Sequence, residues 1–342
     1  MNNKRVLIFC LIILFFLLLP ILLDIFEIPN NSERFKSLPS NDLGHPSPYI
    51  NIANELTNSS EPIDILILGS SFGWTGLDAS IITEKLSKEI GRSAKVLNFC
   101  SNWRGEDQYY IILHEILKKR EVKFVVFTQP VWSIQQQNTW HFRTSHFMKF
   151  SDNYLLDGLS VLDKITWYGH LVLGAPRQLI SGLRPNLIPD IIPHAESFGS
   201  MLKKRGFHGE EFKIYEPLIN QKEVNLEIGK SEYKDFDHNF PKFQTFWFNR
   251  IRELLDNNKI NRALISIPIW SHRNDNFIRR SLVLNDIYQC DLIANVPKKL
   301  FGRFDDKKQK LFFYNEHMNY NGAKYFTNSI ANKIIDKYKC IK

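Results

Sequence analysis

The chain has 342 residues, of which 44% are hydrophobic and 23% are charged, and its net charge is +8. This composition is ordinary for a globular fold. The basic excess suits anionic partners such as phospholipid headgroups or acidic glycans, or serves general solubility.

The N-terminus carries an almost unbroken apolar stretch, residues 6–23, directly after Lys4 and Arg5. Its length is close to the roughly 20 residues that cross a bilayer as a helix, and Pro20 lies near the outer end, where it is tolerated. Basic residues before the stretch predict a cytoplasmic N-terminus. Residues 24–29 offer no small-x-small cleavage site, which a signal peptide needs. We therefore predict an uncleaved single-pass anchor, residues 1–28, and an extracytoplasmic main domain, periplasmic or on the cell surface, without contact to nucleic acid.

The cysteines and histidines show no metal-ligand spacing. Cys10 lies in the predicted span, and Cys100, Cys290 and Cys340 form no C-x-x-C pair. We therefore predict no metal site and no cofactor. One disulfide among the last three cysteines is compatible with an oxidising compartment, but the sequence does not assign it.

After a polar linker at residues 29–60, apolar runs alternate with amphipathic segments. Continuous apolar strands joined by helices are typical of a parallel sheet with helices on both faces, a three-layer α/β fold. Strands are predicted at 63–68, 94–99, 122–128, 263–268 and 291–296. Helices are predicted after the capping residue Asp78 and at 106–119, 243–257, 274–287 and 320–338.

Residues 131–240 interrupt this alternation with many aromatic residues, Gly and Pro, and without clean periodicity. The segment is too long for a structureless loop in a compact domain. We predict a large, mainly helical insertion after the third strand, between the α/β segments 61–130 and 241–342. Two interpretations are open: a lid or substrate platform, and an aromatic-rich packing lobe.

The first predicted strand ends in Gly69-Ser70-Ser71, and His317 lies near the other end of the chain. In open α/β sheets, ligands bind at the carboxyl ends of the strands. A glycine there allows a tight turn, which can lift a serine out of the sheet and place backbone N–H groups beside it. A serine hydroxyl is a poor nucleophile until a base takes its proton, so the pair predicts serine nucleophilic catalysis.

Three segments resemble the SGNH (GDSL-type) hydrolases. Residues 64–71 resemble the first block, in which the serine of G-x-S is the nucleophile, so the match implies Ser71. Residues 96–105 resemble the second block, which supplies a backbone oxyanion donor, and residues 317–323 resemble the block that carries the base, here His317. The resemblance covers roughly residues 60–130 and 260–338 and implies a flavodoxin-like sheet.

With its anchor, the chain is more closely similar to alginate O-acetylation proteins and to the D-alanine transfer proteins of teichoic acid synthesis. Such proteins cooperate with a membrane-bound O-acyltransferase, which the resemblance makes an expected partner. The sequence also departs from the family. Tyr314 stands where the family has an aspartate that orients the histidine.

The remaining site residues stay open as alternatives. Asp305, Asp306 or Glu316 could replace the missing acid, or a backbone carbonyl could orient the histidine in a Ser–His dyad. Gly105 is the only glycine of the second block, and Trp103 is the alternative occupant of the position where the family has its glycine. Asn102 or Gln129 could supply the side-chain amide of the oxyanion hole.

The sequence thus predicts a membrane-anchored serine acyltransferase or esterase acting on O-acyl groups of a cell-envelope glycan or glycolipid. Ser71 would form the acyl-enzyme and His317 would be the base. The alternative, favoured by Tyr314, is a catalytically inactive SGNH-like glycan-binding or scaffold subunit of an envelope acylation complex.

Overall fold

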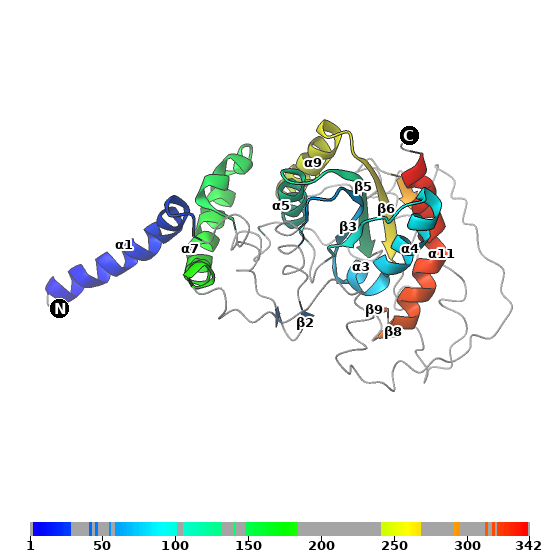
Figure 1. Ribbon diagram of the computed structural model, residues 1–342. Helices are drawn as coiled ribbons and strands as arrows, with labels where there is room; N and C mark the ends of the chain where they lie inside the picture. Colours follow the sequence, from blue (N-terminus) through cyan, green and yellow to red (C-terminus); the bar gives the residue numbers. More distant parts are fainter. Residues whose placement is uncertain are drawn as a thin grey trace.

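The computed structural model describes residues 3–28, 59–100, 105–130, 148–183, 241–267 and 320–340 (Figure 1). It also describes Glu55, Trp140 and short strand segments at 41–42, 45–46, 291–293, 312–313 and 317–318. The helix expected at 274–287 lies outside the described residues, as do residues 184–240 of the expected insertion.

A five-stranded sheet forms the centre of the fold, in the order β4-β3-β5-β6-β7. Its strands are β3 (Ile63–Gly69), β4 (Val96–Asn98), β5 (Val122–Pro130), β6 (Asn261–Ile267) and β7 (Asp291–Ile293). Every pairing is parallel; Leu66, for example, lies opposite Leu97 on one side and Val125 on the other. All seven residues of β3 are buried, as expected for a central parallel strand. The predicted α/β fold with a parallel sheet is confirmed.

Helices cover both faces of this sheet (Figure 1). On one face lie α4 (Ala79–Ile90) and α11 (Tyr320–Lys339), together with the short helix α3 (Ser71–Gly76). On the other face lie α5 (Glu106–Leu117) and α9 (Lys242–Asn257). Trp247 of α9 and Phe326 of α11 are fully buried on opposite faces. Burial of each such side chain contributes roughly 1.5–3 kcal/mol to folding.

Local signals explain where α4 begins and ends. The carboxylate of Asp78 accepts a hydrogen bond from the Ser80 N–H at 3.0 Å, which caps the helix as predicted. Gly91 ends the helix in the left-handed conformation, with φ of 68°.

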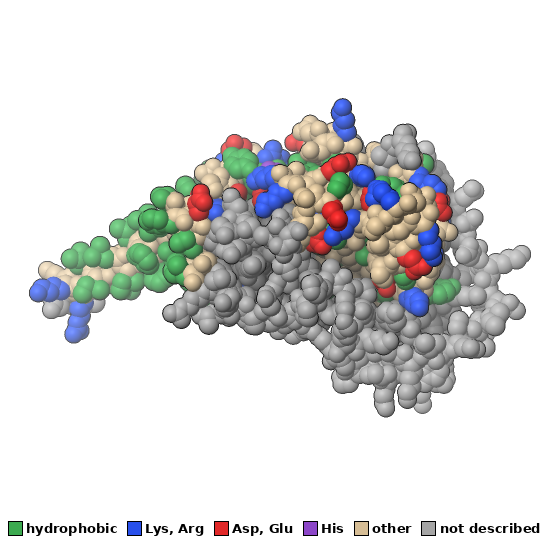
Figure 2. All heavy atoms as spheres, viewed as in Figure 1, with side chains coloured by type: hydrophobic (Ala, Val, Ile, Leu, Met, Phe, Trp, Pro, Cys, Tyr) green, Lys and Arg blue, Asp and Glu red, His purple; other side chains and the backbone are tan. Residues whose placement is uncertain are grey.

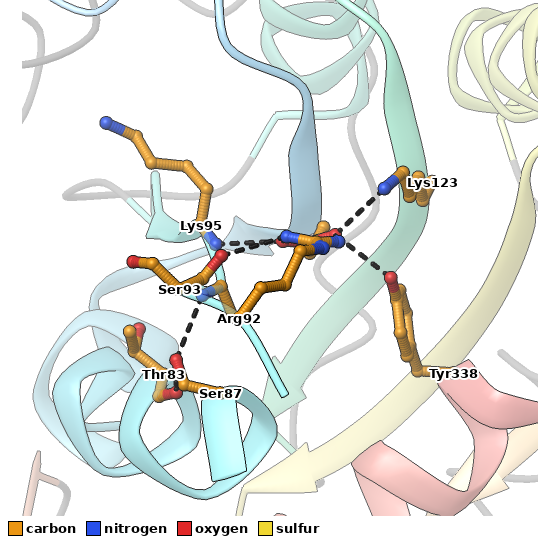
Figure 3. A network of polar contacts seen from close by, with 9 residues as sticks. Thr83, Ser87, Arg92, Ser93, Lys95, Lys123 and Tyr338 are labelled. Atoms are coloured by element: carbon orange, nitrogen blue, oxygen red, sulfur yellow. Dashed lines mark hydrogen bonds and ion pairs between the residues drawn. The ribbon is translucent and has the colours of Figure 1, made fainter. Parts of the chain in front are cut away.

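The amino-terminal edge of the sheet is held by ion pairs. Asp64, at the start of β3, accepts hydrogen bonds from Arg92 and Lys123 and from the Lys95 N–H (Figure 3). Nearby, the buried guanidinium of Arg120 contacts the carboxylate of Glu55 at 2.9 Å. Glu55 belongs to the predicted linker, so this part of the linker is attached to the α/β domain.

Two described elements of residues 131–240 pack beside the α5 and α9 face: the 3-10 helix η2 (Phe150–Leu156) and α7 (Val161–Leu183). Trp140 packs edge-on against Phe243 and Trp247 of α9. Trp167 of α7 joins the same hydrophobic core. Trp140 and Trp167 therefore contribute to the core of the molecule.

Among the helices that the structure describes, α1 (Asn3–Ile25) is long and apolar enough to cross a membrane. Its buried residues are Leu19, Pro20 and Leu23, all near its carboxyl end, whereas the large hydrophobic residues between Val6 and Leu18 are exposed. A core helix of a water-soluble domain would bury such residues, so the exposure favours a lipid environment.

Candidate functional site

Ser71 is the first residue of α3 and follows β3 after a single intervening residue. Ser70 is the N-cap: its backbone is extended, and its carbonyl accepts hydrogen bonds from the N–H groups of Gly73 (3.0 Å) and Trp74 (3.2 Å). The Ser70 hydroxyl is buried and has no hydrogen-bond partner among the described residues, whereas Ser71 is only half-buried. Of the two serines, Ser71 is the one that an incoming ligand can reach.

Two glycines allow α3 to lie against the end of β5. A Cβ atom on Gly69 would lie 1.8 Å from Thr128 Oγ1, and one on Gly73 would lie 2.0 Å from the same oxygen. Either contact is far too short for a real side chain. The sequence predicts that Gly69 allows the turn after the strand, but it gives no signal for Gly73. The close approach to Thr128 requires a glycine at both positions.

Side chains from two other elements fix the far end of α3. The Asn98 amide, at the end of β4, donates hydrogen bonds to the carbonyls of Gly73 (3.2 Å) and Leu77 (3.1 Å). Thr327 of α11 accepts a hydrogen bond from the Asp78 N–H at 2.9 Å. Neither contact is predictable from local sequence; the only signal for Asn98 is a polar residue at the end of an apolar strand.

His317 lies in β9 (His317–Met318), which pairs antiparallel with β8 (Phe312–Phe313). β9 packs against α3: a Cβ atom on Gly76 would lie 3.8 Å from Met318 Sδ. The fold thus brings the backbone of His317 to the helix that begins at Ser71. The His317 side chain lies outside the described part of the structure.

Gly105 is buried and forms the N-cap of α5, where its carbonyl accepts a hydrogen bond from the Tyr109 N–H at 3.1 Å. The backbone of Gln129 lies in β5 opposite Ser266 of β6. The remaining candidates, Asn102, Asp305, Asp306, Glu316 and Tyr314, lie outside the described residues.

The topology sets these segments at one edge of the sheet. Because the strands are parallel, the residues that follow β3, β4 and β5 all emerge at the carboxyl edge. α4, which follows β3, and α5, which follows β4, cover opposite faces of the sheet. The chain runs from β3 outward to β4 and then back past β3 to β5, so the strand order reverses beside β3. Such a reversal is the usual ligand position in doubly wound sheets, and Ser71 lies there.

The same edge holds polar residues for which the sequence predicts only a helix. Glu106, Asp107 and Gln108 form the first turn of α5 and are completely buried. Carboxylates are favoured there because the amino end of a helix carries partial positive charge. In the sequence, the signal for this polar group is the pair of acids directly after Gly105, which follows an apolar strand.

Cys100, at the same edge, is not a competing nucleophile. Its sulfur lies 3.3 Å from Thr128 Oγ1 and is fully buried. Burial raises the pKa of the thiol to about 12, against the opposing effect of the Thr128 hydrogen bond. Only a thiolate is strongly nucleophilic, so Cys100 acts as a packing residue near neutral pH.

The described residues contain no cluster of three or more His, Cys, Asp or Glu side chains that could hold a metal ion. No protein-family model matches the chain, and no curated protein matches its sequence.

Proposed function

We propose that this chain is a membrane-anchored, extracytoplasmic serine acyltransferase or esterase that acts on O-acyl groups of a cell-envelope glycan or glycolipid. The position of Ser71 carries the proposal. It is an accessible serine at the start of α3, on the carboxyl edge of a central parallel strand, and α3 packs against the β9 segment that contains His317.

The strand order supports an SGNH-like fold. Numbered along the chain, the five strands lie in the order 2-1-3-4-5, which is the order of flavodoxin-like doubly wound sheets. In such a fold, the segment between β5 and α9, which includes η2 and α7, is an insertion after the third strand. The three sequence segments that resemble SGNH blocks fall at the end of β3, at the end of β4, and in β9 together with the first turn of α11.

The proposed chemistry proceeds through an acyl-enzyme. His317 takes the proton of the Ser71 hydroxyl, and Ser71 Oγ forms a bond to the acyl carbon. Backbone N–H groups at Ser71 and near Gly105, or an amide of Asn102 or Gln129, would stabilise the oxyanion. The ester C–O bond then breaks, and the alcohol leaves with the proton from His317. A sugar hydroxyl or water attacks the acyl-enzyme and restores Ser71.

The membrane topology completes the proposal. α1 would cross the bilayer with Lys4 and Arg5 in the cytoplasm, which leaves the α/β domain outside. This location gives access to envelope polymers. A membrane-bound O-acyltransferase is the expected partner, because an acyl donor made inside the cell has to cross the membrane before Ser71 can use it.

A second candidate function is a catalytically inactive glycan-binding or scaffold subunit with the same fold. Tyr314, in the place of the acid that would orient His317, favours this alternative.

Labelling with a fluorophosphonate probe separates the two candidates. The full-length protein and the Ser70→Ala variant should be labelled, and Ser71→Ala should not. Ser70→Ala is the matched control, because the Ser70 side chain makes no capping hydrogen bond to α3. Absence of label on the unmodified protein would favour the scaffold.

A further inference from the structure

The helix α7 exposes a long apolar stripe. Six large aliphatic side chains on it, Val161, Leu162, Ile165, Leu173, Ile180 and Leu183, are between 51% and 74% exposed. Residues 162, 165, 169, 173, 180 and 183 follow helical spacing and therefore share one face. Gly169 continues this line, since a Cβ atom there would meet no atom within 4 Å. Arg177 is the exposed charged residue on the same face.

The opposite face of α7 is firmly attached to the protein. Trp167 and Leu171 are buried in the main hydrophobic core. The Gln178 side-chain amide donates a hydrogen bond to the Met148 carbonyl at 3.3 Å. α7 is therefore held with its apolar stripe outward. Contiguous apolar surfaces of this kind mark membrane or protein contacts.

The membrane helix lies directly against α7. Leu19 and Leu23 of α1 pack on Ala175 in a separate small cluster. The Tyr168 hydroxyl donates a hydrogen bond to the Leu17 carbonyl at 2.5 Å. In Figure 1, α7 crosses the carboxyl-terminal end of α1, and Figure 2 shows the hydrophobic side chains that cover α1 up to this crossing.

A further contact fixes the end of α1. The carboxylate of Asp24 accepts hydrogen bonds from the Ser151 N–H at 2.6 Å and from its hydroxyl at 3.0 Å. Ser151 belongs to η2, so the last turn of α1 is attached to the same part of the protein as α7. The relative position of the two helices is thus set by both apolar and polar contacts.

The depth of these contacts follows from helix geometry. A helix rises about 1.5 Å per residue, so Leu17 lies about 12 Å along α1 from its last residue, Ile25. When α1 spans the bilayer, the segment that touches α7 lies in the outer leaflet and the headgroup region. Interfacial amphipathic helices bury their apolar face about 5–10 Å deep at this level.

We propose that α7 is an interfacial membrane helix whose apolar stripe inserts into the outer leaflet of the bilayer that α1 spans. Lipid is the occupant because the stripe adjoins the exposed apolar surface of α1, which is itself in lipid. Arg177 is exposed on the same face, where its charge would lie at the phosphate level. The inference rests on the transmembrane placement of α1 in the proposed function but not on the chemistry of Ser71.

The consequence is a fixed position of the α/β domain above the membrane. α1 alone would be a tether. With α7 in the interface and its Trp167 face joined to the core, the domain would have one height and one orientation. The carboxyl edge with Ser71 would then stay at a constant distance from the membrane surface, which suits a substrate attached to that membrane.

Fluorescence quenching in lipid vesicles tests the proposal. Single cysteines are introduced by Ile165→Cys, Leu173→Cys or Ile180→Cys in the full-length chain, with Cys10, Cys290 and Cys340 replaced by serine. Cys100 can stay because it is buried. Each cysteine receives a nitrobenzoxadiazole label, and the protein is reconstituted into vesicles of phosphatidylcholine and phosphatidylglycerol. The substituted side chains are exposed, so the changes leave the core intact.

The aqueous control is Lys324→Cys, on the exposed face of α11. Relative to this control, labels on the stripe should show blue-shifted emission. Phosphatidylcholine with a nitroxide near the headgroup should quench them several-fold more strongly. Leu11→Cys in α1 is the lipid control. Quenching by aqueous iodide instead would overturn the proposal, because the stripe would face water. Blue-shifted emission without quenching by either agent would also overturn it, since a second copy would then cover the stripe. Fluorophosphonate labelling of Ser71 is measured separately and does not depend on either result.

Discussion

The hydroxyl of Tyr338 donates a hydrogen bond to the buried carboxylate of Asp64 at 2.9 Å, which joins the last helix to the first strand of the sheet (Figure 3). The contact lies at the amino-terminal edge, opposite the carboxyl edge that holds Ser71. In parallel α/β proteins this edge usually serves stability, so its side chains can be changed without touching the site.

Replacing Tyr338 by Phe should lower the free energy of unfolding by roughly 1.5 kcal/mol, because a hydrogen bond to a charged acceptor is lost. Burial and the Asp64 hydrogen bond raise the pKa of Tyr338 to about 12. In the unfolded chain the pKa is about 10, so the stabilisation is complete below pH 10 and is lost as the pH rises toward 12. Urea unfolding of both proteins at several alkaline pH values checks this. If the unfolding free energy of Tyr338→Phe fell with rising pH as steeply as that of the unmodified protein, the prediction would be contradicted. Tyr154→Phe, at an exposed position, is the control.

The carboxylate of Asp64 should make the folded protein less stable at acidic pH. Burial by itself would raise its pKa, but hydrogen bonds from Arg92, the Lys95 N–H, Tyr338 and Lys123 outweigh this effect and hold the pKa well below its usual range. The folded protein therefore keeps the charge when the unfolded chain, with a pKa of about 3.9, begins to protonate. The stabilisation is present above about pH 4 and is lost as the pH falls further.

Asp64→Asn removes this dependence. The variant should be less stable than the unmodified protein at pH 7. The difference in unfolding free energy between the two proteins should become smaller between about pH 4 and pH 2. Urea unfolding at several pH values measures it. A constant difference in unfolding free energy across that range would show that the Asp64 charge is not the cause.

The close approach of α3 to β5 predicts that Gly73 tolerates no side chain. In Gly73→Ala, the new Cβ atom would lie 2.0 Å from Thr128 Oγ1 and 2.5 Å from Cys100 Sγ. Overpacking of this kind costs roughly 1–3 kcal/mol and should displace α3, so both thermal stability and probe labelling of Ser71 should fall. Gly169→Ala is the matched control, since its Cβ atom would meet open space. Equal melting temperatures for the two variants would refute the packing argument.

The order of elements was predictable because their signals are local. The apolar run of β3, the Asp78 cap of α4 and the glycine after Leu68 each act through neighbours in the chain. Boundaries were less accurate: the ladder of β4 spans residues 96–98 of the predicted 94–99, and β5 continues to Pro130. These ends depend on pairing with the adjacent strand, which periodicity does not report.

Contacts between distant segments were not predictable. Gly73, Asn98 and Thr128 shape the Ser71 site only because the fold brings β4 and β5 to α3. The apolar stripe of α7 was missed for another reason. Residues 131–240 show no clean periodicity as a whole, yet α7 has a one-sided pattern, which Gly169, Gly174 and Pro176 obscure in the sequence.

His317 provides the last prediction. If it is the base for Ser71, His317→Ala should slow fluorophosphonate labelling by roughly 10²–10⁴-fold, the usual contribution of a general base, while the unfolding transition stays in place. The position of β9 beside α3 makes the effect specific, because the segment that contains His317 packs against the helix that begins at Ser71. The matched control is His114→Gln, in the last turn of α5, far from the Gly105 end. A His317→Ala variant that labels at the rate of the unmodified protein would remove His317 from the mechanism and leave Ser71 without its proposed base.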